Sequence, residues 1–168
     1  EEISGILNGT TNYILTKMIR ENKAFDDLLK RAQEKGYAEA DPTDDVEGKD
    51  ACRKICILAA LAYGRHIYPE QVYTCGITGI TTEDAACAEA GGMALKLLGR
   101  VFQVEDGKIA IYVSPHAVPQ ESPLASVDGV FNGILIRGNA VGDGMFYGRG
   151  AGKLPTASAV VGDVVDCI

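Results

Sequence analysis

The spacing of hydrophobic residues changes partway along the chain. In the first half, apolar residues recur every three or four positions, which is the spacing of one face of an α-helix. In the second half, most apolar residues fall in short runs separated by turn-forming residues, which is typical of strands. This order predicts an α+β fold, with a mixed, largely antiparallel sheet covered by helices, in a single domain over residues 1–168.

The helices of this pattern have recognisable ends. The turn Asn8–Thr11 can cap the first helix, and Gly36 can end the second. The third helix is apolar without interruption over Ile55–Tyr63, so we expect it to be buried on every side. Thr82 is expected to cap the fourth helix, and Pro155 to stand at the start of the fifth. The predicted helices cover Tyr13–Ile19, Asp26 up to Gly36, Gly48–Tyr63, Thr82–Ala90 and Thr156–Ile168.

The other apolar segments are predicted to be strands. One opens the chain, one follows the third helix, and the rest form two hairpins. Asp106-Gly107 marks the turn of the first hairpin, and Gly138-Asn139 that of the second. The predicted strands are Glu2–Leu7, Gln71–Ile77, Ala94–Val104, Lys108–Val113, Val130–Arg137 and Gly144–Tyr147.

The composition excludes several classes of protein. The chain has 16 Lys and Arg against 23 Asp and Glu, a net charge of −7 in 168 residues. Nucleic acid and anionic membrane surfaces repel such a chain, so neither is expected as a partner. No apolar run approaches the roughly 20 residues that a membrane span needs. Glu1-Glu2 is not the basic start of a signal peptide, and we expect a cytoplasmic protein.

The cysteines and histidines form no recognisable metal or redox motif. The 5 cysteines are irregularly spaced and no C-x-x-C occurs. We interpret them as buried free thiols in a reducing compartment. His66 and His116 have no serine or cysteine partner in the pattern, so structural roles are expected for both.

The main candidate for chemistry is a charged pair at the polar start of the third predicted helix. Asp50 and Lys54 stand at positions i and i+4, so their side chains share one face. The pair is either a structural ion pair or part of a pocket in which Lys54 hands a proton to a substrate oxygen. Glu39, on the polar loop Tyr37–Gly48, can return to the same place. The acids of this loop do not follow the EF-hand pattern; a solvated loop is favoured over a two-carboxylate magnesium site.

A glycine-rich stretch precedes the last predicted helix. Gly148–Gly152 reads G-x-G-x-G, which differs from the G-x-G-x-x-G of a dinucleotide-binding turn and from a P-loop. Free backbone N–H groups at such a helix start can receive an anion or an amide. The alternative is a tight turn that packs against another element.

Residues Ala32–Lys54 read AQEKGYAEADPTDDVEGKDACRK. They combine A-x(3)-G-Y with D-P-x-x-D-[LIVM]-x-G-x-D-x(3)-K, a long and specific pattern that closely resembles the signature of the homoserine dehydrogenase family. Gly5–Leu15 and Tyr147–Val160 resemble the segments by which the chain of this family enters its catalytic domain and returns toward its nucleotide-binding domain, so the resemblance covers essentially the whole chain. Cys52 stands where alanine is more usual, and a buried thiol is expected to be tolerated there.

The resemblance implies a role for individual residues. Lys54 matches the family's proton donor and acceptor, and Asp50 matches the acid that positions this lysine and contacts the substrate. Glu39 matches the carboxylate that meets the substrate's amino group. Tyr37 and Thr10 are expected to contact the substrate as well.

Other positions match the cofactor side of the family's cleft. Gly36 falls near the nicotinamide, together with Tyr37, and Gly152 matches a glycine that contacts the cofactor. Gly9 and Asn8 are expected to line the same cleft. NAD or NADP is implied as the cofactor, bound mainly by an upstream Rossmann domain that this chain lacks. The resemblance also places a second active-site lysine and a sodium-binding loop before Glu1, and no metal site is expected within the chain.

The implied reaction is the reversible conversion of L-homoserine and L-aspartate 4-semialdehyde, in the biosynthesis of threonine, methionine and isoleucine. The chain is then the catalytic and dimerisation domain of a cytoplasmic homodimer, a fragment that we expect to be inactive alone. The sequence does not discriminate NAD from NADP. Two alternatives stay open: a non-catalytic amino-acid-binding or dimerisation module, and a structural domain in which the Asp50–Lys54 pair only orders its helix.

Overall fold

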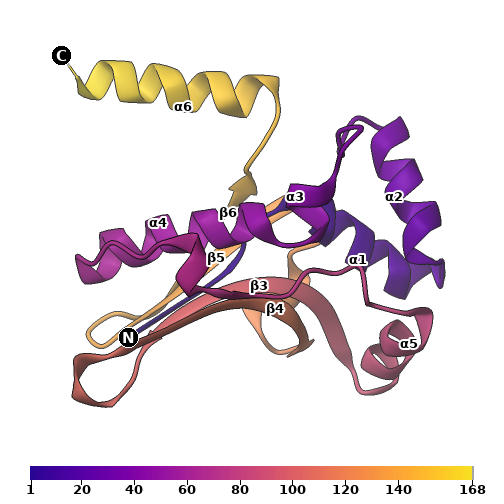
Figure 1. The fold of residues 1–168 in the computed structure, drawn as a ribbon, viewed down its shortest axis with the longest axis horizontal. Coiled ribbons are helices and arrows are strands. Elements are labelled where there is room, and N and C mark those ends of the chain that lie inside the picture. The colour runs from indigo at the N-terminus through magenta and orange to yellow at the C-terminus, as the bar shows by residue number, and fades with distance from the viewer. Residues whose placement is uncertain (168) are drawn as a thin grey trace.

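Strand β1 (Glu2–Ile6), the first element of the chain, lies inside the sheet. A computed structural model describes residues 1–167, apart from the side chain of Asp106, and within that range it has one six-stranded sheet in the order β2-β4-β3-β1-β5-β6 (Figure 1). β1 pairs antiparallel with β3 on one side and β5 on the other. Only β2 (Tyr73–Thr74) runs parallel to its neighbour, β4. The predicted mixed, largely antiparallel sheet is confirmed.

Both predicted hairpins are present. β3 (Met93–Gln103) pairs with β4 (Ile109–Pro119), and β5 (Phe131–Gly138) pairs with β6 (Gly142–Arg149). β4 continues beyond the predicted end at Val113 because its partner β3 offers backbone groups all the way from Met93.

The predicted strand Gln71–Ile77 is largely wrong. Only β2 pairs in the sheet, because Pro69–Gln71 forms a 3-10 turn before it. After it, the chain presses Gly76 against the loop before α4: a Cβ on Gly76 would lie 2.2 Å from the carbonyl oxygen of Val46. The Cys75 N–H still donates to Val113 of β4, but the Ile77 N–H donates at 2.8 Å to the Val46 carbonyl at the end of α3, so the segment leaves the sheet.

The helices confirm the predicted positions with small differences at their ends, and the end predicted for the last helix at Ile168 lies outside the described residues. Asn8 caps the first helix through the Thr11 N–H, and Gly36, at φ +70°, follows the second. Thr81 caps the fourth predicted helix, not Thr82. The polar loop Tyr37–Gly48 contains one additional helical turn. The helices are α1 (Gly9–Glu21), α2 (Phe25–Glu34), α3 (Thr43–Val46), α4 (Lys49–Tyr63), α5 (Thr82–Ala90) and α6 (Lys153–Asp166).

The main hydrophobic core lies between the sheet and the helices α1 and α4. Ile14 and Leu15 of α1 and Ile55 of α4 are fully buried in it, against Leu97 and Val101 of β3. A smaller cluster lies on the other face of the sheet, where Ile6 and Leu98 pack beneath the 3-10 turn Pro123–Ser126, together with Ala94, Val118, Leu124, Ala125 and Val127. The helices therefore cover one face, and a short segment covers part of the other.

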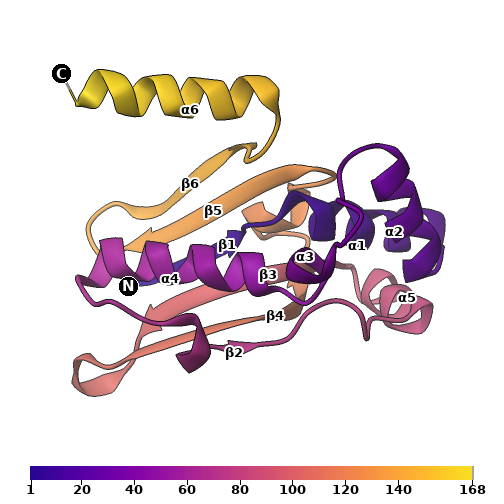
Figure 2. The ribbon, with the colours of Figure 1, turned by 45° about the horizontal axis from the view of Figure 1, so that its top comes forward.

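The prediction that the third helix is buried on every side is wrong. α4 contacts the sheet with one face only, and Ile57 and Leu61 on the opposite face are 60% and 79% exposed. α6 has no buried residue, and it lies apart from the sheet beyond β6 (Figure 2). An apolar pattern indicates that a surface is favourably buried, but it does not show that other residues of this chain bury it.

The cysteines are only partly as expected. Cys52 and Cys56 are buried free thiols, whereas Cys75, Cys87 and Cys167 are exposed. Burial raises the pKa of the Cys56 thiol to about 11, so it stays protonated near neutral pH. Within the described part of the chain, no helix is long and apolar enough to cross a membrane.

Glu21 predicts a dependence of stability on pH. Hydrogen bonds from Lys17 and Arg31 hold the pKa of Glu21 at about 2, below the ordinary 4.5. A carboxylate with a lowered pKa stabilises the fold above its ordinary pKa, and this contribution is lost as the pH falls from 4.5 toward 2. Glu21→Gln is therefore expected to lower the urea midpoint at pH 7 and to have a smaller effect at pH 3. The exposed Glu34→Gln is the control; an equal shift at both pH values would contradict the assignment.

Candidate active site

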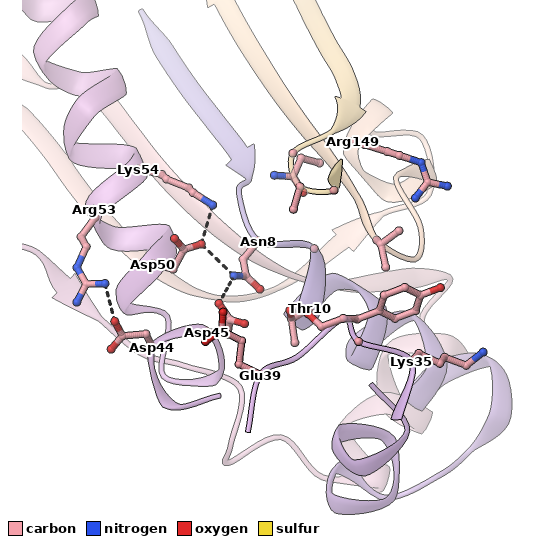
Figure 3. Close-up of a pocket in the computed structure, with 18 of the residues that line it drawn as sticks. Asn8, Thr10, Lys35, Glu39, Asp44, Asp45, Asp50, Arg53, Lys54 and Arg149 are labelled. Carbon is pink, nitrogen blue, oxygen red and sulfur yellow. Dashed lines mark hydrogen bonds and ion pairs between the residues drawn. The ribbon is translucent and has the colours of Figure 1, made fainter. Parts of the chain in front are cut away.

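A cavity of about 560 Å³ opens where the start of α1, the loop before α4 and the end of β6 meet (Figure 3). Segments far apart in the sequence build its wall. Its lining residues are Asn8, Gly9, Thr10, Lys35, Gly36, Tyr37, Glu39, Asp41, Asp44, Asp45, Asp50, Arg53, Lys54, Val130, Asn132, Arg149, Gly150, Ala151 and Gly152.

Lys54 and Asp50 lie at the centre of a hydrogen-bonded cluster in this cavity. The Lys54 Nζ donates to Asp50 Oδ2 at 2.8 Å and to the carbonyl oxygen of Leu7 at 3.1 Å. Asn8 Nδ2 donates to Asp50 Oδ2 at 2.9 Å and to Asp45 Oδ1 at 2.7 Å. Asn8 is itself held in place, because its side-chain oxygen caps α1. The cluster therefore ties α4 to the start of α1 and to the acidic loop.

The ammonium group of Lys54 keeps a proton free for a ligand. An ammonium has three N–H donors, and among residues 1–167 only Asp50 and the Leu7 carbonyl accept from it. The Lys54 side chain is 46% exposed and that of Asp50 is 27% exposed. A pair this accessible contributes little to stability, but it presents a positioned proton donor to the cavity.

The local backbone explains why both side chains reach the cavity. Gly48 precedes α4 with φ +79°, a left-handed conformation that reverses the chain from the loop into the helix. Asp50 then falls in the first turn of α4, where the helix dipole favours a negative charge. Lys54 follows one turn later on the same face.

The structure places all of the predicted site residues on this one cavity. Besides Lys54 and Asp50, the cavity is lined by Glu39, Tyr37, Thr10, Gly36, Gly9 and Gly152. The Thr10 Oγ1 donates to the Tyr37 carbonyl at 2.8 Å, which fixes the loop against α1. The Gln33 side chain donates to the Glu39 carbonyl at 3.1 Å. The Glu39 carboxylate has no ion-pair partner within the described range, so it is available to a cationic ligand group.

Asp41, Asp44 and Asp45 of the loop each interact with a different partner. Asp41 accepts from Thr43, Asp44 pairs with Arg53 at 2.6 Å, and Asp45 accepts from Asn8. Over residues 1–167 no group of three or more candidate ligands is placed to hold a metal ion. The composition predicted a solvated loop; the structure shows that four of its acids also line the cavity.

Several residues of the site carried no clear signal in the sequence. Asn132 lies far from the signature segment, yet its Nδ2 donates at 3.2 Å to the same Leu7 carbonyl that accepts from Lys54. Arg149 and Lys35 also line the cavity. A polar Asn132 between Phe131 and Gly133 in an apolar strand was a weak signal. Its partner could not be found without the pairing of β1 with β5.

The Gly148–Gly152 stretch has features of both interpretations, a tight turn and a helix start with free backbone N–H groups. A Cβ on Gly150 would lie 2.3 Å from the Nδ2 of Asn132, so this backbone packs tightly against β5. Gly152 has φ +124° and precedes α6 without a side-chain cap. The stretch is thus a tight turn that also lines the cavity with bare backbone.

Asn8→Ala is expected to affect both stability and the site. Losing the cap of α1 should lower the free energy of unfolding by about 1–2 kcal/mol. Asp50 and Asp45 would also lose the donor that they share, so we expect kcat/KM to fall about tenfold in the longer protein that would contain this chain as a domain, which is called the parent protein below. Thr81→Ala removes the cap of α5, outside the cavity, and should lower only stability. Equal kcat/KM values in the two variants would contradict a role for Asn8 in the site.

The chain is similar to homoserine dehydrogenases over its whole length. The family model described as homoserine dehydrogenase matches residues 1–165. The homoserine dehydrogenase of Bacillus subtilis is 48% identical over 98% of this chain, and that of Synechocystis is 47% identical over 100% of it. The chain spans only 38% and 40% of the lengths of these relatives.

Solved structures show the same likeness. A homoserine dehydrogenase from Thiobacillus denitrificans is 49% identical, with a TM-score of 0.95 over 99% of this chain and 38% of that one. A hyperthermophilic archaeal homoserine dehydrogenase in complex with NADPH is 34% identical, with a TM-score of 0.79 over 98% of this chain and 46% of that one. The fold of this chain is therefore similar to that of solved homoserine dehydrogenases over nearly its whole length.

Proposed function

The chain belongs to the homoserine dehydrogenase family, and we propose that residues 1–168 form the catalytic and dimerisation domain of an enzyme that interconverts L-homoserine and L-aspartate 4-semialdehyde with NAD or NADP. The observation that carries the proposal is the Lys54 ammonium, held by Asp50 and the Leu7 carbonyl with a donor left over toward the cavity. An amino-acid-binding module has no need of such a donor. The Asp50–Lys54 ion pair is also partly exposed to solvent, and exposed pairs contribute little to stability, which argues against a purely structural role for Lys54.

Lys54 is the residue that handles the proton. When the aldehyde is reduced, its oxygen gains negative charge, and the ammonium of Lys54 stabilises that charge and donates the proton. In the reverse direction the neutral amine takes the proton from the hydroxyl of homoserine. Asp50 and the Leu7 carbonyl orient the amine for both directions.

The substrate's ammonium group suits the acidic wall of the cavity. We propose that Glu39 binds it, since the carboxylate is free of ion pairs in the described structure and lines the same cavity as Lys54. Asp50 is proposed to contact the substrate as well, and Tyr37 and Thr10 to shape the floor of the cavity, linked by their hydrogen bond.

The residues present fit a nicotinamide cofactor on the glycine-lined side. A side chain at Gly9 would place its Cβ 2.8 Å from the Val130 carbonyl, and Gly150 is equally restricted, so bare backbone faces the cavity. We propose that Gly9, Gly36 and Gly152 contact the cofactor there. When bound, the cofactor supplies or accepts the hydride.

The remaining binding surface for NAD or NADP is proposed to lie in a separate nucleotide-binding domain of the parent protein, together with the sodium-binding loop. The exposed apolar side chains of α6 support an arrangement in which this helix packs against such a domain. They include Leu154, Val160, Val161, Val164 and Val165. The chain alone is then expected to have no measurable turnover.

We also propose that the parent protein is a cytoplasmic homodimer. The family resemblance supports both the cytoplasmic location and the dimer. The sheet face opposite the helices also supports the dimer, because a second copy could pack against it. That face is only partly covered, by Pro123–Ser126, and has a shallow hollow of about 270 Å³ that includes Arg100, His116 and Leu135. Analytical ultracentrifugation of the parent protein checks the oligomeric state; a monomer at micromolar concentration would contradict it.

The test of the proposed function is homoserine-dependent reduction of NAD⁺ and NADP⁺ by the parent protein that contains this chain. Turnover with at least one cofactor is expected. A folded parent protein that reduces neither cofactor would reject the dehydrogenase and favour a binding module, which isothermal titration with L-homoserine would then detect.

A further inference from the structure

The charged residues of the cavity are divided between its two sides. The acids Asp44, Asp45, Glu39 and Asp50 lie on one side with Arg53 and Lys54, whereas Lys35 and Arg149 lie beyond Thr10 on the other (Figure 3). The acidic side suits a ligand's ammonium group. The second side is basic and suits an anion.

The two cations of the basic side have no acidic partner. Arg53 pairs with Asp44, and Lys54 pairs with Asp50. By contrast, neither Arg149 nor Lys35 makes an ion pair with any residue that the structure describes. Unpaired cations that line a cavity are the groups that an anionic ligand would meet first.

The guanidinium of Arg149 is nevertheless held in position. Arg149 is the last residue of β6, opposite Phe131 in the β5 register, and its guanidinium carbon lies 4.8 Å from the centroid of the Phe131 ring. That ring stacks on Tyr147 at 5.0 Å. The stacking supports the planar group without using its N–H donors, which stay available.

Lys54 and Arg149 are separated by other groups of the wall. The Leu7 carbonyl accepts from Lys54 on one side and from Asn132 on the other, and Asn132 packs against Gly150. A substrate of four carbon atoms whose oxygen is at Lys54 and whose ammonium is at Glu39 already uses two groups of the acidic side. An anion on the basic side is either the substrate's own carboxylate or part of a larger ligand that extends past Asn132.

We propose that Arg149 and Lys35 bind a phosphate group of the nicotinamide dinucleotide. The proposal rests on the proposed function, because that function is what brings a dinucleotide to this cavity. It adds that the catalytic domain itself contributes charge to cofactor binding, through two residues to which the family resemblance assigns no role. The guanidinium and the ammonium supply the charge-assisted hydrogen bonds that phosphate oxygens accept.

The experiment measures dinucleotide binding directly. Isothermal titration with NADPH and with NADH is performed on the parent protein and its Arg149→Gln and Lys35→Gln variants. We expect each substitution to weaken the Kd of the better-bound dinucleotide about tenfold, and high salt to reduce the difference. Lys30→Gln removes an exposed charge of α2 that does not line the cavity, and it should leave the Kd unchanged.

The KM for homoserine, measured at saturating cofactor, separates the possible anions. It should stay unchanged in both variants. A raised KM for homoserine with an unchanged dinucleotide Kd would overturn the proposal and assign the cations to the substrate's carboxylate. An effect on neither quantity would overturn it too, since both cations would then be merely solvated.

The proposed function can fail separately. A parent protein that binds dinucleotide, loses affinity on Arg149→Gln and shows no homoserine-dependent turnover would reject the substrate while supporting the phosphate contact. A folded parent protein that binds no dinucleotide would reject both.

Discussion

Replacing Lys54 with alanine is expected to abolish turnover of the parent protein and to leave its fold intact. The substitution removes the cationic proton donor that Asp50 positions, and loss of general acid–base catalysis typically lowers kcat by about 10²–10⁴. The half-exposed ion pair contributes at most about 1 kcal/mol, so the urea midpoint should change little. Steady-state kinetics with homoserine and urea unfolding measure the two effects.

Two further variants sharpen this test. Lys49→Ala removes an exposed lysine of the same helix that pairs with Glu47, and it should retain full kcat. Lys54→Arg keeps the positive charge but cannot release a proton near neutral pH, so kcat should stay low while homoserine still binds. If Lys54→Ala instead retained kcat and unfolded at much lower urea, the pair would be structural and the catalytic proposal would fail.

The largest loss of stability is expected from Lys96→Ala. Lys96 lies in β3 with 1% of its surface exposed, and its Nζ donates to Asn12 Oδ1 at 3.3 Å, to Asp128 Oδ1 at 3.1 Å and to the Val127 carbonyl. Burial lowers the pKa of Lys96, and Asp128 opposes that shift. Removing the cation leaves a cavity and takes the donor from Asn12 Oδ1, whereas the Val127 carbonyl keeps the Asn12 Nδ2 donor and Asp128 keeps its pair with Arg20. The free energy of unfolding should therefore fall by about 2–5 kcal/mol, as for other large buried side chains cut back to alanine.

Guanidinium unfolding of the chain measures this loss. Lys108→Ala removes an exposed lysine beside the turn of the same hairpin and should change the free energy of unfolding by less than about 0.5 kcal/mol. Lys96→Met fills part of the volume without the charge, and its loss should be smaller than that of alanine. A loss below about 1 kcal/mol for Lys96→Ala would mean that the buried ammonium contributes little to the fold.

Lys96 also connects the core to the active site. It holds the segment that begins at Val127, and Val130 of that segment contacts Gly9 at the cavity wall. Nothing in the sequence marked this lysine, because a lysine in an apolar strand has the same pattern whether it lies at an edge or beneath another segment.

Most of the helices and both hairpins were predictable because their signals are local. Asn8–Thr11 satisfies the free N–H groups of a helix start, Gly36 adopts the positive φ that ends a helix, and Asp106-Gly107 suits a tight turn. The i,i+4 geometry of Asp50 and Lys54 follows from the helix alone. The signature pattern added the roles of these residues and of Glu39.

The errors were made where one segment meets another. The strand expected at Gln71–Ile77 is mostly a loop, because Gly76 packs against the backbone of Val46 and Glu47. α4 was expected to be buried all round, yet Ile57 and Leu61 are exposed in this chain. In each case the residues have the local character of the predicted element, but this character does not show which other segment, if any, packs against them.

The sequence by itself determined the α+β class, most of the element types, the family and the acidic segment with its lysine, since periodicity, caps and a contiguous motif all act over a few residues. Only the tertiary structure decided that β1 lies between β3 and β5, and this pairing brings Leu7 and Asn132 to Lys54. It likewise decided that Arg149 and Lys35 share a cavity with residues that are far from them in the chain. Contacts between distant segments depend on how the sheet assembles, and no local propensity specifies them.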